Sequence, residues 1–428
     1  MILYYLGRRV SMRKEIYAAL QVANHEIRIL VGEHHNNRLH ILKVERVAHT
    51  GMINNEIVDS KSIIEAITKA TANIEKNVKI KVSRVLLVIP SINLQRVKRQ
   101  LHSDIHDPLS RILKENVQEI YQSAYNQRPL DNLELINALI YQYKVNGVYL
   151  KKAPINEKSS RLFAEVDLYY VNRKIVYQLA SIVEEADLEI LDVCVDQIGI
   201  AKEASLFDYE NENYRVIIDI ERQATYLGLV YKGRLMHSDV LNIRTQDWVD
   251  LITKTLDIPV EVSTKLMLNN VDLDNASPGK EPICLWSRDK KSYTCSQADI
   301  MELLTPSINQ HIEAIKNACL GIIEDGPTEF IVTGEGSMIK GVTTRLQREL
   351  GCEVRTHLPS TLGARDGSLV ALLGAFYNHI DMREWKRAPK ADTSIEEVSM
   401  PQPKPKETGI TNRLKKILNQ SDKGELNE

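Results

Sequence analysis

The amino-acid sequence predicts an α/β protein of two related lobes, the first of which carries an inserted subdomain. Two observations support this fold class. A pattern of strand, turn, strand, turn, strand and helix occurs near the start of the chain and again roughly 200 residues later. Residues 91–167 show strand and helix signals that follow neither copy of the pattern. We therefore expect a duplicated α/β domain with a cleft between its halves.

The first copy begins with three strand-like runs, IYAALQVA, EIRILVGE and RLHILKVERV, which are separated by residues that form turns. These runs predict a three-stranded meander. A helix is predicted in SKSIIEAITKATANIEKN. Its apolar residues at helical spacing are Ile63, Ile64, Ile67, Ala70 and Ile74. The apolar run VSRVLLVIP then predicts a buried strand.

The second copy runs from VIIDI through TYLGLVY and RLMHSDVL to the helical stretch TQDWVDLITKTL. Residues 173–205 precede it and predict a helix, a strand and a second helix. When the two copies are aligned on their first turns, Gln21 lies opposite Asp219. Such a hairpin has the shape of a nucleotide-binding hairpin, but Glu221 and Arg222 occupy places where glycine would let the backbone approach a phosphate.

A glycine turn follows the apolar strand EFIVT in the last third of the chain. The turn, TGEGSMIKG, opens a predicted helix and contains Gly334, Gly336, Ser337 and Gly341. Free backbone N–H groups and the helix dipole at such a place favour an anion, or the edge of a ribose and base. Because glycine turns before helices are common, the turn alone does not identify a ligand.

The chain ends in a proline-rich, charged linker followed by the amphipathic stretch ITNRLKKILNQ. The apolar face of this stretch is Ile410, Leu414, Ile417 and Leu418, and the flanking basic residues are Arg413, Lys415 and Lys416. One such helix binds an anionic membrane weakly, whereas many on one polymer bind strongly. The alternative is a short solvated helix.

The amino-acid composition argues against several classes of protein, among them nucleic-acid-binding, zinc-binding, membrane-spanning and secreted proteins. The chain has 55 basic and 57 acidic residues and a net charge of -2, so no overall field favours nucleic acid. The five cysteines contain no CxxC pair, which argues against a zinc site and a disulfide framework, and no metal site is predicted. No run approaches the roughly 18 apolar residues of a membrane span, and the N-terminus has the wrong order for a signal peptide. We expect a reduced, cytosolic protein.

Several segments together resemble the bacterial FtsA family of cell-division proteins, from about residue 16 to the C-terminus. They are TGMINNEIVDSKSIIEAI, DQIGIAKEAS, VTGEGSMIKG, LVALLGAFY and the linker with its basic amphipathic helix. The order and spacing of these segments are more specific than any one of them. The resemblance implies the actin-like fold, a ribonuclease H-like domain that has been duplicated, with an SHS2-type inserted subdomain and a C-terminal amphipathic helix.

The resemblance also implies the division of the chain. Subdomain 1A is expected in residues 14–82, 169–213 and 361–385, inserted subdomain 1C in 83–168, subdomain 2A in 214–242 and 326–360, subdomain 2B in 243–325, a linker in 386–409 and a membrane-targeting helix in 410–420.

In FtsA proteins ATP lies between the lobes, and the two hairpins usually contain Asp-Ile-Gly-Thr and Asp-Ile-Gly-Gly. Here the first hairpin has Gln21-Val22-Ala23-Asn24 and the second has Asp219-Ile220-Glu221-Arg222. Nucleotide contacts are expected from Asp219, Thr225, Lys265, Gly334, Gly336, Ser337 and Gly341. Glu221 would oppose a phosphate by roughly 1–4 kcal/mol at about 4 Å, which Arg222 would partly offset. We predict weak or altered binding of ATP with Mg, no catalytic residue and improbable hydrolysis.

The function implied is a scaffold that ties FtsZ to the cytoplasmic face of the membrane at the septum, self-associates into filaments, and recruits later division proteins through the inserted subdomain. The FtsZ C-terminal tail would dock on subdomain 2B. There Pro306-Ser307 replaces the proline and arginine frequent in the family, and Arg288, Lys290 and Lys291 would compensate. A kinase-type enzyme of the same superfamily and a PilM-like pilus-assembly adaptor are the alternatives.

Overall fold

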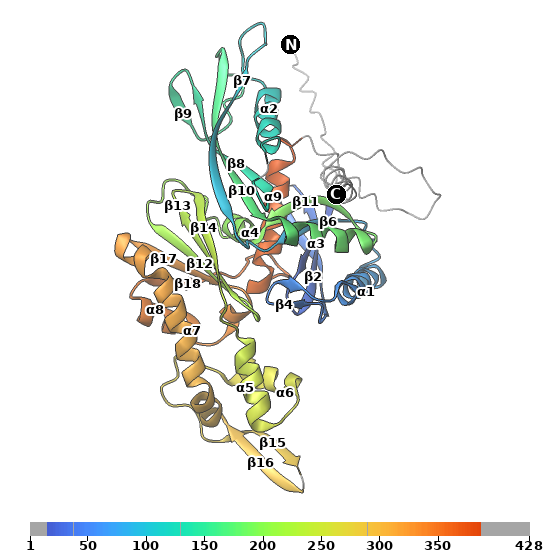
Figure 1. The fold of residues 1–428 in the computed structure, drawn as a ribbon, viewed down its shortest axis with the longest axis vertical. Helices are drawn as coiled ribbons and strands as arrows, with labels where there is room; N and C mark the ends of the chain where they lie inside the picture. Colours follow the sequence, from blue (N-terminus) through green and yellow to red (C-terminus); the bar gives the residue numbers. More distant parts are fainter. Residues whose placement is uncertain (1–14, 37, 129, 289, 387–428) are drawn as a thin grey trace, which may run out of the picture.

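The computed structural model describes residues 15–36, 38–128, 130–288 and 290–386. Two lobes lie side by side, and each is built on a five-stranded sheet. The inserted subdomain projects from one end of the molecule, and helices α5 to α7 with a β-hairpin project from the other (Figure 1). The linker beyond Lys386 and the predicted membrane helix at 410–420 lie outside the described residues.

Lobe I contains the first copy of the predicted pattern. Its sheet has the order β11-β6-β1-β2-β3. The strands are β1 (Glu15–Val22), β2 (Glu26–His35), β3 (Arg38–Ala48), β6 (Arg84–Ile89) and β11 (Glu189–Val195). Strands β1, β2 and β3 form the predicted antiparallel meander, and β6 and β11 extend the sheet as parallel strands.

Helices cover both faces of this sheet. Helices α1 (Ser60–Val78) and α3 (Arg173–Glu185) pack together on one face, and α4 (Asp196–Glu203) and α9 (Val370–Met382) pack on the other, between the lobes. Helix α1 begins where Asp59 accepts a hydrogen bond from the backbone N–H of Ser62 at 3.2 Å. Its buried stripe is Ile63, Ala66, Ile67, Ala70 and Ile74. Because this stripe has helical spacing, it sets which side of α1 meets the sheet.

Lobe II repeats the strand order of lobe I. Its sheet has the order β14-β13-β12-β17-β18, and its first three strands are again antiparallel while the last two are parallel to β12. The strands are β12 (Tyr214–Ile220), β13 (Thr225–Tyr231), β14 (Arg234–Leu241), β17 (Thr328–Thr333) and β18 (Glu353–Thr356). Helix α8 (Val342–Leu350) joins β17 to β18. The matching order confirms the predicted duplication.

The inserted subdomain is a four-stranded sheet with the order β7-β10-β8-β9 and one helix against it. Its elements are β7 (Gln95–Asp104), α2 (Lys114–Tyr125), β8 (Leu133–Val145), β9 (Val148–Leu150) and β10 (Arg161–Asn172). The predicted range 83–168 begins too early, because β6 pairs with β1 and β11 in lobe I. It also ends too early, because β10 continues to Asn172. The SHS2 type of this subdomain stays a prediction.

A second projection extends lobe II at the opposite end of the molecule (Figure 1). Its elements are α5 (Gln246–Leu256), α6 (Val260–Asn270), β15 (Pro282–Arg288), β16 (Lys291–Ser296) and α7 (Gln297–Asp325). Helix α7 continues through Pro306. Within the part of the chain that the structure describes, we find no helix with the length and apolar character needed to cross a bilayer.

Candidate functional site

The two hairpins that the repeat predicts face each other across the boundary between the lobes. Residues of the β1–β2 hairpin, including Gln21 and Asn24, line one side of a small cavity, and Asp219 and Glu221 of the second hairpin line the other. The cavity has a volume of about 30 Å³. Sites for small ligands usually measure roughly 300–1,000 Å³, whereas a single water needs only about 10–15 Å³. The space between the hairpins therefore suits a water rather than a triphosphate.

Arg28, on β2, fills the space beside this cavity. Its side chain is fully buried, and all five of its N–H donors have acceptors. Nε donates to Glu26 at 2.7 Å, and Nη1 donates to the backbone oxygen of Ser368 at 3.2 Å. Nη1 and Nη2 donate to both carboxylate oxygens of Glu221 at 3.1 and 2.7 Å. Nη2 also donates to Glu335 at 2.5 Å.

Arg28 and these three glutamates form a group that we call the interlobe ion cluster: Arg28, Glu26, Glu221 and Glu335. Arg28 and Glu26 belong to lobe I, whereas Glu221 and Glu335 belong to lobe II. Burial alone would lower the pKa of Arg28, but the carboxylates of Glu221 and Glu335 raise it well above its ordinary value. Arg28 is therefore a permanent cation that links the lobes.

Three further basic residues surround the interlobe ion cluster. His25 lies 3.0 Å from Glu335, and Arg222 lies 3.5 Å from the other oxygen of that carboxylate. Arg46 donates to Glu26 at 2.7 Å and also to Asp366 at 2.6 Å. The expectation that Arg222 would offset Glu221 is wrong, because Arg28 makes that pair and Arg222 contacts Glu335 instead.

Two buried aspartates face the cavity near Glu221. Burial raises the pKa of Asp219 well above its usual value, and the carboxylates of Glu221 and Asp196 raise it further. Burial also raises the pKa of Asp196 to about 7, although hydrogen bonds from the backbone N–H groups of Gln197 and Ser91 oppose the shift. Three carboxylates thus line the cavity, and the basic residues that also line it, His25 and Arg222, are both paired with Glu335.

We expect the Asp196→Asn variant to lose a pH dependence of stability that the wild type shows. Asp196 has a pKa of about 7 in the folded chain and about 3.9 in an unfolded chain. Its stabilising contribution is therefore complete below about pH 4 and is lost as the pH rises through 7. The difference in unfolding free energy, wild type minus variant, should fall by about 1.4 kcal/mol per pH unit between pH 5 and 7, measured by urea unfolding.

Asparagine can accept the same two backbone hydrogen bonds, so the variant keeps the local geometry. Burial lowers the pKa of His311 to about 4, which makes stability fall as the pH drops below 6.5. That effect is common to both proteins and cancels in the difference. A difference that does not change with pH would contradict the prediction.

The glycine turn packs against lobe II's own hairpin. It forms the short helix η1 (Glu335–Met338), and Ser337 donates from its hydroxyl to the oxygen of Gly334 at 2.7 Å. A Cβ on Gly334, whose φ is 81°, would lie 2.5 Å from the oxygen of Ile220, and one on Gly336 would lie 2.3 Å from the Ile220 side chain. A Cβ on Gly341 would lie 2.4 Å from the nitrogen of Asp274. The close packing of the chain with itself accounts for all three glycines.

The other expected nucleotide contacts lie apart from this turn. Thr225 is fully buried, and its hydroxyl lies 3.2 Å from Nε2 of His311 on α7, in the core of lobe II. Lys265 is exposed on α6 and does not line the cavity between the hairpins. The structure thus brings together Asp219, Gly334 and Gly336, but not Thr225 or Lys265. These residues do not fit a nucleoside triphosphate, because the cavity between the hairpins is small and is lined by the carboxylates of Asp196, Asp219 and Glu221.

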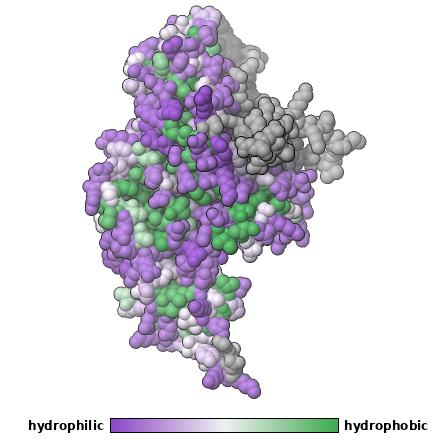
Figure 2. Space-filling view, viewed as in Figure 1, coloured by the Kyte–Doolittle hydropathy of each residue, from purple (hydrophilic) through white to green (hydrophobic). Residues whose placement is uncertain are grey.

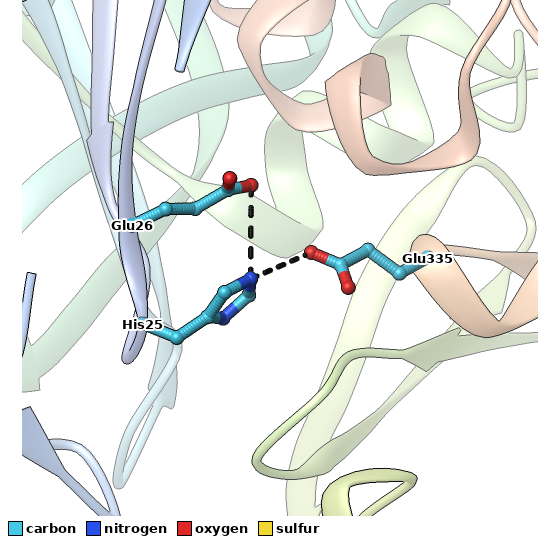
Figure 3. A group of neighbouring side chains, drawn as sticks. All are labelled: His25, Glu26 and Glu335. Carbon is cyan, nitrogen blue, oxygen red and sulfur yellow. Dashed lines mark ion pairs between the residues drawn. The ribbon is translucent and has the colours of Figure 1, made fainter. Parts of the chain in front are cut away.

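His25, Glu26 and Glu335 converge on one point and have the atom types of a metal site (Figure 3). However, Oε1 of Glu26 and Oε1 of Glu335 both accept hydrogen bonds from Arg28. A metal ion there would lie beside a buried guanidinium that already uses the same oxygens. We therefore assign Glu26 and Glu335 to the interlobe ion cluster, with His25 beside it, and not to a metal site.

Sequence reasoning missed Arg28, Glu26, Glu335 and Asp196. One signal was available, because Arg28 interrupts the apolar run of β2 between Ile27 and Ile29, which are both buried. A charged residue at such a position needs a buried partner. The identity of that partner was not visible in the local sequence.

Comparison with known proteins finds relatives that match most of the chain. The cell division protein FtsA of Bacillus subtilis (strain 168) is 23% identical over 371 residues, which cover 84% of this chain and 82% of the relative. FtsA of Enterococcus hirae is 21% identical over 360 residues, which cover 82% of this chain and 80% of the relative. No protein-family model matches the chain.

Solved structures resemble the whole fold. A chain of the PilM-PilN type IV pilus biogenesis complex matches with a TM-score of 0.56 and 12% identity, covering 85% of this chain and 98% of the other. MreB5 of Spiroplasma citri bound to AMPPNP matches with a TM-score of 0.51 and 14% identity, covering 86% and 97%. At such identities the likeness concerns the fold alone. It confirms the predicted α/β fold of the actin-like class.

Proposed function

Since this chain is a divergent homologue of the FtsA cell-division proteins, we propose that it is an actin-like scaffold that ties FtsZ filaments to the cytoplasmic membrane. The observation that carries this proposal is the similarity to FtsA of several species over about four-fifths of both chains. A scaffold protein needs surfaces that bind partners and does not need to hydrolyse ATP. This agrees with the small cavity between the hairpins and with the Arg28–Glu221 ion pair beside it.

The projection formed by α5, α6, α7 and the β15–β16 hairpin is the proposed docking site for the FtsZ C-terminal tail. On the hairpin, Leu285 is 72% exposed, and Tyr293 is also exposed. Lys290 and Lys291 lie at the hairpin turn, where they would attract an acidic peptide. Apolar residues also gather over α5 and α6 near the lower end of the molecule (Figure 2), where Val260 and Leu268 are exposed.

The remaining roles follow from the same homology. The inserted subdomain, at the end of the molecule opposite to the FtsZ site, would recruit later division proteins. Self-association into filaments would place many C-terminal helices on one membrane and convert weak binding into stable attachment at the septum. In this proposal the protein hydrolyses no ATP.

Vesicle co-sedimentation tests the proposal. The full chain should carry FtsZ to vesicles that contain anionic lipid, and deletion of residues 410–420 should abolish this. A Lys415→Glu/Lys416→Glu variant should bind vesicles at least about 30-fold more weakly, because each basic residue contributes about 1 kcal/mol at an anionic surface. Lys404→Glu/Lys406→Glu, in the linker, is the matched control for charge and should bind more strongly than that variant.

Two outcomes would favour the alternatives. Unchanged vesicle binding after the deletion would favour a PilM-like pilus-assembly adaptor. ATP turnover that depends on a small phosphate acceptor would favour a kinase-type enzyme. Vesicle binding that carries no FtsZ would contradict the docking surface on the β15–β16 hairpin.

A further inference from the structure

We propose that the interlobe ion cluster is an internal substitute for a bound nucleotide, which holds the two lobes together and excludes nucleoside triphosphates. The cluster joins the first hairpin of lobe I to the second hairpin and the glycine turn of lobe II. It joins Arg28 of lobe I to Glu221 and Glu335 of lobe II. This inference does not depend on the proposed function, because it concerns only the chain's own closed state.

The hydrogen bonds of Arg28 leave it no donor for a phosphate. Its five N–H groups already meet three carboxylates and one backbone oxygen. A phosphate in the same place would have to displace Glu221 or Glu335 from the guanidinium. It would then leave a buried carboxylate unpaired next to a new anion, which is strongly unfavourable.

The basic residues around the cluster are also paired. Glu335 lies between Arg28, His25 and Arg222. Burial would raise the pKa of Glu335, but the hydrogen bond from His25 and the charge of Arg28 hold it well below its usual value. The carboxylate of Glu335 thus stays ionised and continues to attract three basic groups. Arg28 and Arg222 are the cations that a phosphate would otherwise use.

The residue opposite Arg28 in the hairpin of lobe I is uncharged. Arg28 is the cross-strand partner of Gln21, and the equivalent pair in lobe II is Asp219 with Tyr226. An aspartate at position 21 would pair with Arg28 inside lobe I. Gln21 carries no charge, and its Oε1 has no hydrogen-bond partner among the described residues. With a neutral glutamine at position 21, Arg28 is available to Glu221 in the other lobe.

Other contacts also join the lobes, and one provides a matched control. Arg234 on β14 donates to Asp167 of the inserted subdomain through Nε and Nη2, both at 2.6 Å. Arg234 is largely buried and pairs across the lobe boundary, but its partner is Asp167, whereas Arg28 pairs with Glu221 and Glu335. Its loss should loosen the inserted subdomain and leave the hairpin turns unchanged.

The test combines nucleotide binding with hydrogen exchange on the full chain. The melting temperature of the wild type should change by about 1 °C or less in about 5 mM Mg-ATP or Mg-ADP. Arg28→Met and Glu221→Gln should raise amide exchange in residues 220–225 and 334–338 by about tenfold or more, whereas Arg234→Met should not. Arg28→Met should also lower the melting temperature by roughly 5–10 °C.

Two results would overturn the inference. A rise of several degrees in the melting temperature of the wild type with Mg-ATP would show that the cleft accepts a nucleotide. Unchanged exchange in both turns of the Glu221→Gln variant would show that the cluster does not hold the lobes. If Arg28→Met fails to fold, the milder Glu221→Gln variant decides the question, because glutamine keeps the shape of the side chain and one acceptor.

Discussion

Gly374→Ala should prevent α4 and α9 from packing at their native distance. A Cβ on Gly374 would lie 1.7 Å from the oxygen of Gly199 and 2.6 Å from its Cα. The reciprocal contact is also tight, because a Cβ on Gly199 would lie 2.6 Å from the oxygen of Ala371. These are backbone atoms of two helices that lie between the sheets, so no side-chain rotation can relieve the clash.

The expected cost is about 3 kcal/mol or more in the free energy of unfolding, at or above the usual range for overpacking. Urea unfolding of the purified chain measures it. Gly321→Ala is the matched control, because Gly321 is exposed in α7 and a Cβ there would meet no atom within 4 Å. That change should stabilise the protein by up to about 1 kcal/mol through helix propensity. A Gly374→Ala variant as stable as the wild type would show that the helices can separate without loss.

The same two helices show how much of the fold was predictable. The segments DQIGIAKEAS and LVALLGAFY were recognised from their resemblance to one family, and they form α4 and α9. That Gly199 and Gly374 meet could not be predicted, because no local pattern specifies the distance between helices so far apart in the chain. The two meanders and the amphipathic helix α1 were predicted correctly because their signals lie within a few residues.

The strand β6 marks the limit of local patterns. Its apolar run indicates a buried strand, and that prediction is confirmed. The sheet to which it belongs depends on pairing with β1 and β11, which lie far away in sequence. A periodicity of apolar residues contains no information about such partners. The predicted range 83–168 therefore placed β6 on the wrong side of a boundary.

The candidate site was predictable in its position but not in its chemistry. Glu221 and Arg222, which stand where glycines were expected, drew attention to the second hairpin. The partner of Glu221 is Arg28, which is 193 residues away, and Arg28 also pairs with Glu335, 307 residues away. Only the folded chain brings these charges together. The glycine turn was likewise predicted to contact a nucleotide, which is the usual ligand of such turns. In the structure, close contact with Ile220 and Asp274 already requires its glycines.

Lys386→Met should produce the second large loss of stability. Lys386 donates to both carboxylate oxygens of Asp192 on β11, at 3.1 and 3.3 Å, and His379 of α9 lies 3.0 Å from the same carboxylate. Burial would raise the pKa of Asp192, but Lys386 and His379 hold it well below its usual range. Removal of the lysine leaves a buried carboxylate short of one cation, which costs about 3–5 kcal/mol.

The pH dependence of stability and a double variant distinguish loss of the Asp192–Lys386 ion pair from a nonspecific loss of stability. Because the folded pKa of Asp192 is depressed, its stabilising contribution is present above its unfolded pKa and is lost as the pH falls below it. The deficit of Lys386→Met, measured by urea unfolding, should therefore be larger at pH 7 than near pH 3. Asp192→Asn/Lys386→Met should recover most of the loss, because both charges of the pair are then gone. A double variant no more stable than Lys386→Met alone would mean that packing of the lysine stem, and not its charge, connects the end of α9 to β11.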